Sequence, residues 1–443
     1  MWGRVWVDNG GGRMNARYVA GLVAGCMLAA GSPVWADDPS MDGDKAEIQM
    51  LKSRLEKLEK RMAQSEMSGS SGGIGQKAGL PTLELPSGLA GLQMSGYADV
   101  SYIYNFAESD PGSGSRTNRT RVFDTEPNGF TPHAFELVLE KPETDEMPVG
   151  FRTDLLIGDD APVIGSTGLG LGAAGDEFEL QQLYITANAP VGDGIDFKVG
   201  KFVTLLGAEV IESPANWNFS RSYLFGFAIP FTHTGALATY PLGEFGSVTA
   251  GIVNGWDIVD DNNKGKSLIG NLTLTPMEGL TLSANGITGA ERTGDNRNDR
   301  SVIDLIATYQ PMEKLTLMAN YDFGHESGLV QGAGTAGFDS AEWQGLALYA
   351  KYDLTDTWSL ASRAEWFDDK DSVRTALTGR DGGTFDDVDF YEVTFTSQWK
   401  LHEHVLARLE YRHDKADEDV FFHDAAGFIN YQDTVAAELI YHF

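Results

Sequence analysis

The sequence of 443 residues is poor in features that mark disulfide-bonded, helical membrane or metal-dependent proteins. Its only cysteine is Cys26, so no disulfide can form within one chain. No run of about 20 apolar residues follows the N-terminal region, which argues against helical membrane spans. Neither a Walker loop nor a His-Glu-x-x-His motif occurs, and the eight histidines are scattered. We therefore expect no catalytic centre, no cofactor and no metal held by histidines.

Basic residues are also scarce. The chain has 33 Lys and Arg against 64 Asp and Glu, which gives a formal net charge of -31. Such a chain repels the phosphates of nucleic acids, so a nucleic-acid partner is excluded.

The N-terminus has the pattern of an export signal. Arg17 precedes an apolar run over residues 18–30, and small residues precede a cleavage site after Ala36. We predict a signal peptide over residues 1–36, in which residues 1–13 are an upstream mis-start. The residues before Cys26 also resemble a lipoprotein cleavage box, so lipidation of Cys26 is an alternative.

Residues 37–67 form a separate polar segment. Ile48, Leu51, Leu55, Leu58 and Met62 recur at spacings of three and four, the pattern of a coiled coil. We expect a periplasmic helix that joins three copies of the chain. The alternative is a single amphipathic helix, residues 45–67, that packs on peptidoglycan or on the β-barrel that the rest of the sequence predicts, as described next. A Gly/Ser/Pro linker over residues 68–91 follows.

From residue 92 onward the chain reads as about sixteen strands of nine to fourteen residues. The last run, residues 433–443, alternates apolar and polar side chains and ends on the aromatic Phe443. The connections after even-numbered strands are short, such as residues 277–279, and those after odd-numbered strands are long, such as residues 368–388. Short turns on one side and long loops on the other are typical of outer-membrane barrels. We therefore predict an all-β fold, a transmembrane antiparallel β-barrel over residues 92–443.

The faces of the predicted strands agree with a barrel in lipid. Leu315, Leu317 and Phe323 alternate with Thr316 and Asn320, which places apolar side chains outside and polar ones inside. A barrel of sixteen strands is too wide for its own side chains to fill, so we expect water inside. Aromatic residues near strand ends are expected at the lipid interfaces; they include Tyr102, Tyr349, Trp358 and Tyr441.

The long connection at residues 204–231 has an unusual composition. It is rich in large apolar residues, which an exposed loop does not normally carry. We therefore expect this loop to fold inward against the barrel wall.

This part of the chain resembles a known family. The carriers of the resemblance are Gly200-Lys201-Phe202, Gly207-Ala208-Glu209, residues 218–222, residues 226–230 and His233-Thr234-Gly235. Together they are similar to the signature block of the OmpL-like β-barrel porins. The resemblance implies a bacterial outer-membrane pore with a third loop folded inward, and it assigns no ligand residues.

Charged side chains that face inward are candidates for the pore constriction, because charge at close quarters selects ions. These candidates are Glu209, Glu212, Arg221, Arg152, Asp154, Arg363, Glu365, Arg408, Glu410 and Arg412. Glu209 and Glu212 have the alternative role of accepting hydrogen bonds from loop amides. Loop-anchoring residues are expected to be Trp217, Phe219, Phe225 and His233.

The sequence thus predicts an integral outer-membrane porin that passes small hydrophilic solutes or ions, with a mild preference for cations. We expect a homotrimer in contact with outer-membrane lipid and lipopolysaccharide. The acidic runs at residues 257–263 and 414–419 suggest loosely bound Ca²⁺ at solvated outer loops. Two alternatives stay open: a plugged barrel that tethers the envelope, and a substrate-specific porin, for example for sugars, that uses Trp217, Tyr223 and Phe225.

Overall fold

A computed structural model describes residues 91–107, 117–144, 147–169, 177–328, 340–370, 372–377, 387–423 and 427–443. The chain divides into two units, residues 1–85 and 86–443. All described residues belong to the second unit. The predicted signal peptide, the coiled segment and the linker up to residue 90 lie outside the described residues, as does Cys26.

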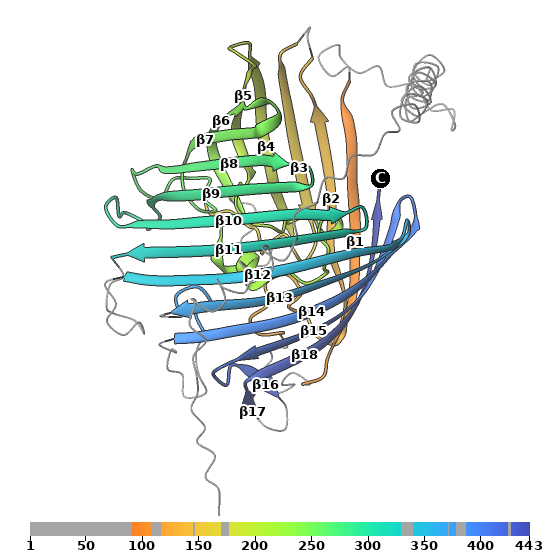
Figure 1. Ribbon diagram of the computed structural model, residues 1–443. Coiled ribbons are helices and arrows are strands. Elements are labelled where there is room, and N and C mark those ends of the chain that lie inside the picture. Colours follow the sequence, from red (N-terminus) through yellow and green to blue (C-terminus); the bar gives the residue numbers. More distant parts are fainter. Residues whose placement is uncertain are drawn as a thin grey trace, which may run out of the picture. The chain divides into compact units, whose positions relative to one another are not determined.

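Sixteen antiparallel strands form a closed barrel, and two short strands pair with each other in one connection (Figure 1). The barrel strands are β1 (Gln93–Asn105), β2 (Gly129–Lys141), β3 (Val149–Ile157), β4 (Phe178–Ala189), β5 (Ile195–Val203), β6 (Thr232–Pro241), β7 (Gly246–Val253), β8 (Ser267–Met277), β9 (Leu280–Ala290), β10 (Asp299–Met312), β11 (Leu315–Ser327), β12 (Ser340–Thr355), β13 (Trp358–Lys370), β14 (Asp387–His402), β15 (Val405–Ala416) and β18 (Tyr431–His442). The short pair is β16 (Phe421–His423) and β17 (Gly427–Ile429). The described helical turns are η2 (Ser213–Ala215), η3 (Leu224–Ala228) and η4 (Gly243–Phe245).

The first and last strands close the barrel. β1 pairs with β18 in antiparallel register, with Tyr97 opposite His442 and Ser101 opposite Glu438. The backbone of Phe443 exchanges two hydrogen bonds with that of Gly96, at 3.0 and 3.1 Å. Closure pairs the two edge strands, as hydrocarbon requires. The predicted barrel and its strand number are confirmed.

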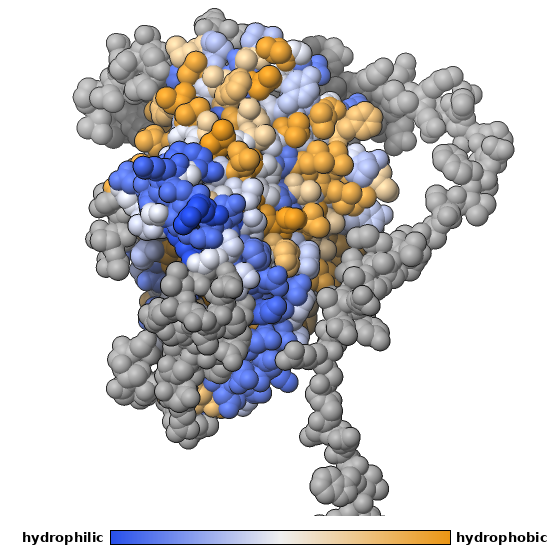
Figure 2. All heavy atoms as spheres, turned by 90° about the vertical axis from the view of Figure 1, so that its left-hand side faces the viewer, coloured by the Kyte–Doolittle hydropathy of each residue, from blue (hydrophilic) through white to orange (hydrophobic). Residues whose placement is uncertain are grey.

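The outside of the barrel is apolar over the strands. Val199, Ile252, Leu268, Ile303 and Leu409 are exposed, while the residues next to them on the same strands face inward. Figure 2 shows apolar residues gathered over the upper part of the described surface in that view, with hydrophilic residues grouped beside and below them. None of the helices among the described residues is long and apolar enough to cross a membrane.

Tight turns join the strands at one end of the barrel. The turn between β8 and β9 consists of Glu278 and Gly279, and the one between β12 and β13 of Asp356 and Thr357. Gly279 has φ of +75°, and a Cβ at this position would lie 2.7 Å from the carbonyl oxygen of Gln310. Glycine fits both conditions at this position, whereas a residue with a side chain would be strained.

Several details differ from the prediction. Strands β12 and β14 extend about two residues beyond their predicted ends, and the β16–β17 pair was not foreseen. The alternation in β4 is irregular because the register shifts between Asp154 and Leu155 of β3, which leaves Gln181 as an extra residue. Tyr349 does not lie at a lipid interface, where it was predicted, since it faces inward and is buried.

The interior is also less open than expected. Loop 204–231 contributes to a buried apolar cluster that includes Leu206, Ile211, Leu224 and Phe225, together with inward side chains of the wall. The inward folding of loop 204–231 against the wall, which its apolar residues predicted, is confirmed, and this loop fills part of the lumen.

Candidate functional site

Loop 204–231 runs from the end of β5 to the start of β6 and lies inside the barrel. Carboxylates of the wall accept hydrogen bonds from pairs of consecutive loop amides. Glu410 on β15 accepts from the N–H groups of Phe219 and Ser220, at 2.7 and 2.9 Å. Glu365 on β13 accepts from Tyr223 and Leu224, both at 2.7 Å. These bonds satisfy backbone donors that no strand partner reaches.

The start of the loop is held by the neighbouring wall. The N–H of Gly207 donates to Asp304 on β10, and that of Ala208 donates to Asn320 on β11 at 3.3 Å. Gly207 has φ of +98°, and a side chain there would collide with Ile229. Glycine is therefore required where the chain turns into the lumen.

Arg363 on β13 connects the loop to the wall through charge. Its Nη1 donates to Glu209 at 2.6 Å and to the carbonyl oxygen of Ser220 at 2.7 Å, while its Nε donates to Glu392 at 2.6 Å. The second oxygen of Glu209 accepts from the N–H of Ser222 at 2.7 Å. Arg363 is only 1% exposed, so this ion pair is shielded from water. Glu209 thus has the hydrogen-bonding role that the sequence left open as its alternative.

Four further arginines donate to loop carbonyl groups, one of them Arg374, which reaches the carbonyl oxygen of Phe227 at 2.6 Å. Arg408 reaches Ser213 and Asn216, at 3.1 and 2.6 Å, and pairs with Glu438 at 2.9 Å. Arg412 donates to the carbonyl oxygen of Arg221 at 2.6 Å. Arg221 in turn donates within the loop, to the carbonyl oxygens of Val210, Ile211 and Phe219. Among the described residues Arg221 forms no ion pair with Glu209 or Glu212, and its side chain is buried.

Aromatic contacts complete the attachment. Tyr223 packs on Phe390 with ring centroids 5.2 Å apart, and Trp217 meets Tyr349 edge to face at 6.3 Å. Phe225 packs on Phe231 at 5.4 Å. Tyr223 and Phe225 are buried, whereas Trp217 is half-buried. The first two therefore lack the free ring faces that a sugar-binding aromatic surface needs.

The end of the loop is fixed at its junction with β6. His233 lies with its ring nitrogens 2.8 Å from the carbonyl oxygen of Gly255 and 3.0 Å from the hydroxyl of Thr204. Asp257 accepts from the N–H groups of Phe231 and Thr232, at 2.9 and 2.8 Å. Burial raises the pKa of Asp257 to about 6, although these two hydrogen bonds oppose the increase. Of the two acidic runs, Asp414 is buried and Asp257 is half-buried, so neither is a fully solvated loop residue.

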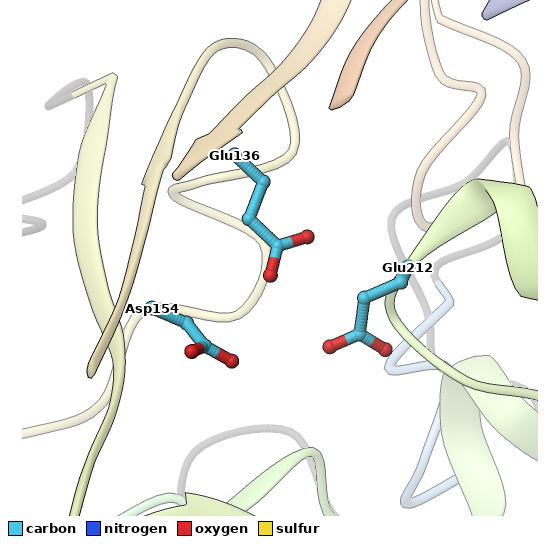
Figure 3. Close-up of side chains that lie close together, drawn as sticks. All are labelled: Glu136, Asp154 and Glu212. Atoms are coloured by element: carbon cyan, nitrogen blue, oxygen red, sulfur yellow. The ribbon is translucent and has the colours of Figure 1, made fainter. Parts of the chain in front are cut away.

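A separate acidic cluster lies where the loop passes β2, β3 and β4. It consists of Glu136, Asp154 and Glu212, whose carboxylates converge (Figure 3). Arg152 binds Asp154 through its Nε at 2.8 Å, and Gln181 donates to Glu212 at 2.5 Å. Glu212 and Arg152 are half-buried, so both are reached by water.

The wall formed by β6–β10 has a different character. Its inward side chains near the tight turns are mainly hydroxyls and amides that bond across strands. Thr239 and Thr249 are 2.9 Å apart, and Thr273 and Ser283 are 3.1 Å apart. A cavity of about 420 Å³ opens at this end, lined by Glu244, Thr275, Met277, Glu278, Gly279, Leu280, Thr281, Thr308, Gln310 and Thr316.

The predicted constriction residues therefore fall into two groups. One group holds the loop and is buried; it comprises Glu209, Arg221, Arg363, Glu365, Arg408, Glu410 and Arg412. The other is the cluster around Glu212, Arg152 and Asp154. Sequence reasoning did not single out Asn320, Gln181 or the threonines. The alternation of side chains along their strands placed Asn320 and the threonines on the lumen side, and this was the one indication of their role. The irregular alternation in β4 gave no such indication for Gln181.

A closed barrel of sixteen strands with an apolar outside and an inward third loop defines the class of outer-membrane porins. The sequence profile described as "Putative beta-barrel porin-2, OmpL-like" matches residues 91–443. The chain belongs to this OmpL-like porin family. No curated protein sequence matches it.

Solved structures share the fold at low sequence identity. An anion-selective porin from Comamonas acidovorans matches with a TM-score of 0.54 and 12% identity, over 80% of this chain and 99% of that one. The outer-membrane channel DcaP of Acinetobacter baumannii matches with a TM-score of 0.51 and 13% identity, over 80% and 97%. OmpT of Vibrio cholerae in its trimer form matches with a TM-score of 0.51 and 12% identity, over 80% and 99%. These similarities concern the fold.

Proposed function

We propose that the barrel is a water-filled channel for passive diffusion of small hydrophilic solutes or ions, narrowed by loop 204–231. The observation that carries the proposal is the one-sided attachment of the loop. Among the described residues, its polar contacts to strand side chains run to β4, β6, β10, β11, β12, β13, β14, β15 and β18. No such contact reaches β7, β8 or β9 in the described part of the loop, and inward side chains near the tight turns of β8 and β9, such as Thr273, Thr281 and Ser283, stay half-exposed.

Side chains that face into a barrel and still contact solvent imply water along that wall, since a packed interior would cover them. Threonine and serine there offer hydrogen bonds without charge, which suits diffusion of varied polar solutes. We assign ion selectivity mainly to Glu212 and Arg152, because they are the half-exposed members of the predicted constriction set.

The test is a single-channel recording of the purified protein in a planar bilayer. Stepwise conductance with ohmic behaviour is expected, with a reversal potential in a salt gradient that indicates mild cation preference. Glu212→Gln is expected to reduce that preference, whereas Glu209→Gln, at a site already paired with Arg363, is expected to change it less. The absence of conductance steps in folded protein would disprove the channel.

The envelope-tether alternative rests on the N-terminal segment. In our proposal residues 1–36 direct export, residues 37–67 lie in the periplasm, and the barrel contacts lipid and lipopolysaccharide as a non-enzymatic homotrimer. Residues 45–67 assist trimer formation or contact peptidoglycan. Deletion of residues 37–79 separates the two functions: a porin keeps its conductance, whereas a tether loses envelope attachment. Chemical cross-linking of both forms would show whether the trimer persists.

A further inference from the structure

Three carboxylates from three elements converge beside the loop. Glu136 comes from β2, Asp154 from β3 and Glu212 from the loop, directly before η2. One ligand oxygen from each lies within 4.8 Å of the others. Figure 3 shows all three carboxylates pointing into the same space.

Each of the three carboxylates has a protein partner, and that of Glu136 is the hydroxyl of Tyr97. Asp154 accepts from Arg152, at 2.8 and 3.1 Å, and also from Gln182. Glu212 accepts from Gln181 at 2.5 Å. Among the described residues, Arg152 is the cation that forms an ion pair with the cluster, so three carboxylates face one positive charge.

Glu136 is the unusual member. It is 1% exposed, and its Oε1 is buried without a hydrogen-bond partner among the described residues. Figure 3 shows its carboxylate directed toward Asp154 and Glu212. A buried carboxylate oxygen without a hydrogen-bond partner costs several kcal/mol, roughly, and a bound cation removes this cost.

We propose that Glu136, Asp154 and Glu212 bind a divalent cation, Ca²⁺, inside the barrel. Oxygens that bind one Ca²⁺ at about 2.3–2.6 Å lie at most about 5 Å apart, which includes the spacing observed here. Mg²⁺ binds at about 2.0–2.1 Å and would draw opposite oxygens to about 4.2 Å. One divalent ion also balances the two negative charges that Arg152 leaves.

The ion has a route to this site and a consequence there. Glu212 is half-buried, so the ion enters from the water-filled side of the loop. Once bound, it links the loop to β2 and β3, a part of the wall different from the one that Glu365 and Glu410 attach. It also neutralises acidic charge beside the proposed diffusion path, so occupancy lowers cation preference.

The test measures Ca²⁺ binding by titration calorimetry on protein refolded from inclusion bodies, free of lipopolysaccharide and treated with chelator. The wild type is expected to bind one Ca²⁺ per chain in addition to weak surface binding. Glu136→Gln and Glu212→Gln are each expected to weaken this site at least tenfold. Glu140→Gln is the matched control, because Glu140 also faces the lumen from β2 and contacts Arg152 at 3.7 Å, but is not one of the three converging carboxylates.

A second probe checks the position of the ion. Tb³⁺ in place of Ca²⁺ should luminesce when tyrosine is excited, because Tyr97 lies opposite Glu136 in the β1–β2 register. The Glu136→Gln variant should lose this signal. Heat-modifiable migration on gels shows whether that variant is folded. Equal Ca²⁺ affinity in wild type and both variants would overturn the proposal, as would Mg²⁺ affinity equal to that for Ca²⁺.

Calcium binding and conduction are measured independently. A barrel that conducts but lacks the site would refute this inference alone. Binding without any conductance would refute the proposed channel alone.

Discussion

Two parts of the inner wall carry different kinds of polar side chain. The wall of β13–β15 has buried charged residues, such as Arg363, Glu365 and Glu410, and each of these is bonded to the loop. The wall of β7–β9 has half-exposed small residues, such as Thr273, Thr281 and Ser283. In these two walls, buried charge marks where the loop is attached, and half-exposed hydroxyls mark where water reaches.

The contrast has a physical cause. A loop crossing the lumen has backbone amides and carbonyls without strand partners, and leaving them unbonded in a packed interior is costly. Ionised side chains form the strongest hydrogen bonds with such groups. A water-lined wall has no such requirement, because water forms hydrogen bonds with the polar groups of the wall. Substitutions in the wall of β13–β15 should therefore change mainly the stability of the protein, and substitutions in the wall of β7–β9 should change mainly permeation.

The largest effect is expected from Arg363→Met. It leaves Glu209 and Glu392 buried with no guanidinium between them, and breaking a buried ion pair typically costs about 3–5 kcal/mol. Urea unfolding in lipid vesicles and protease cleavage within the loop measure the loss. Lys351→Met on the adjacent β12 is the control, because Lys351 makes a half-exposed pair with Asp353 at 3.8 Å. Equal losses in the two variants would contradict the assigned role of the buried wall.

A smaller effect is expected from Glu410→Gln. An amide has a single carbonyl oxygen, so it cannot accept from Phe219 and Ser220 as the two carboxylate oxygens do. Hydrogen bonds to charged groups contribute about 1.5–3 kcal/mol each, and we expect a loss in this range. The same unfolding assay checks it, and noisier single-channel currents are expected from a loosened loop. If Glu410→Gln were as stable as wild type, the amide pair would not anchor the loop.

Gly324→Ala tests the packing beside the loop. A methyl group on Gly324 would overlap the ring of Trp343, whose Nε1 donates to the carbonyl oxygen of Ala228 at 3.0 Å. Overpacking of this kind costs about 1–3 kcal/mol. Gly286→Ala is the control, because its Cβ would stay 3.4 Å from the nearest atom. Unfolding followed by Trp fluorescence measures the stability of the Gly324→Ala and Gly286→Ala variants. A Gly324→Ala protein as stable as the control would show that Trp343 can move freely.

The sequence predicted the barrel because strand periodicity and loop lengths are local properties. It also predicted that loop 204–231 folds inward, since its apolar residues need cover. The pairing of Glu209 with Arg363 was beyond reach, because 154 residues separate them and only the closed barrel brings them together. The acidic cluster was hidden for a similar reason: Gln181, which holds Glu212, occupies the extra position of an irregular strand pair.

The smallest effect on stability, and a clear one on permeation, is expected from Thr281→Lys. Thr281 is half-exposed, lines the cavity near the tight turns, and faces Thr308 across the β9–β10 pair. Because water solvates the new ammonium group, unfolding should change by less than about 0.5 kcal/mol. The added positive charge should shift the reversal potential toward anion preference, and Thr281→Asp should shift it the opposite way. If both variants folded and neither altered selectivity, ions would not pass along this wall. The proposed difference between the wall of β13–β15, which holds the loop, and the wall of β7–β9, along which solutes pass, would then be refuted.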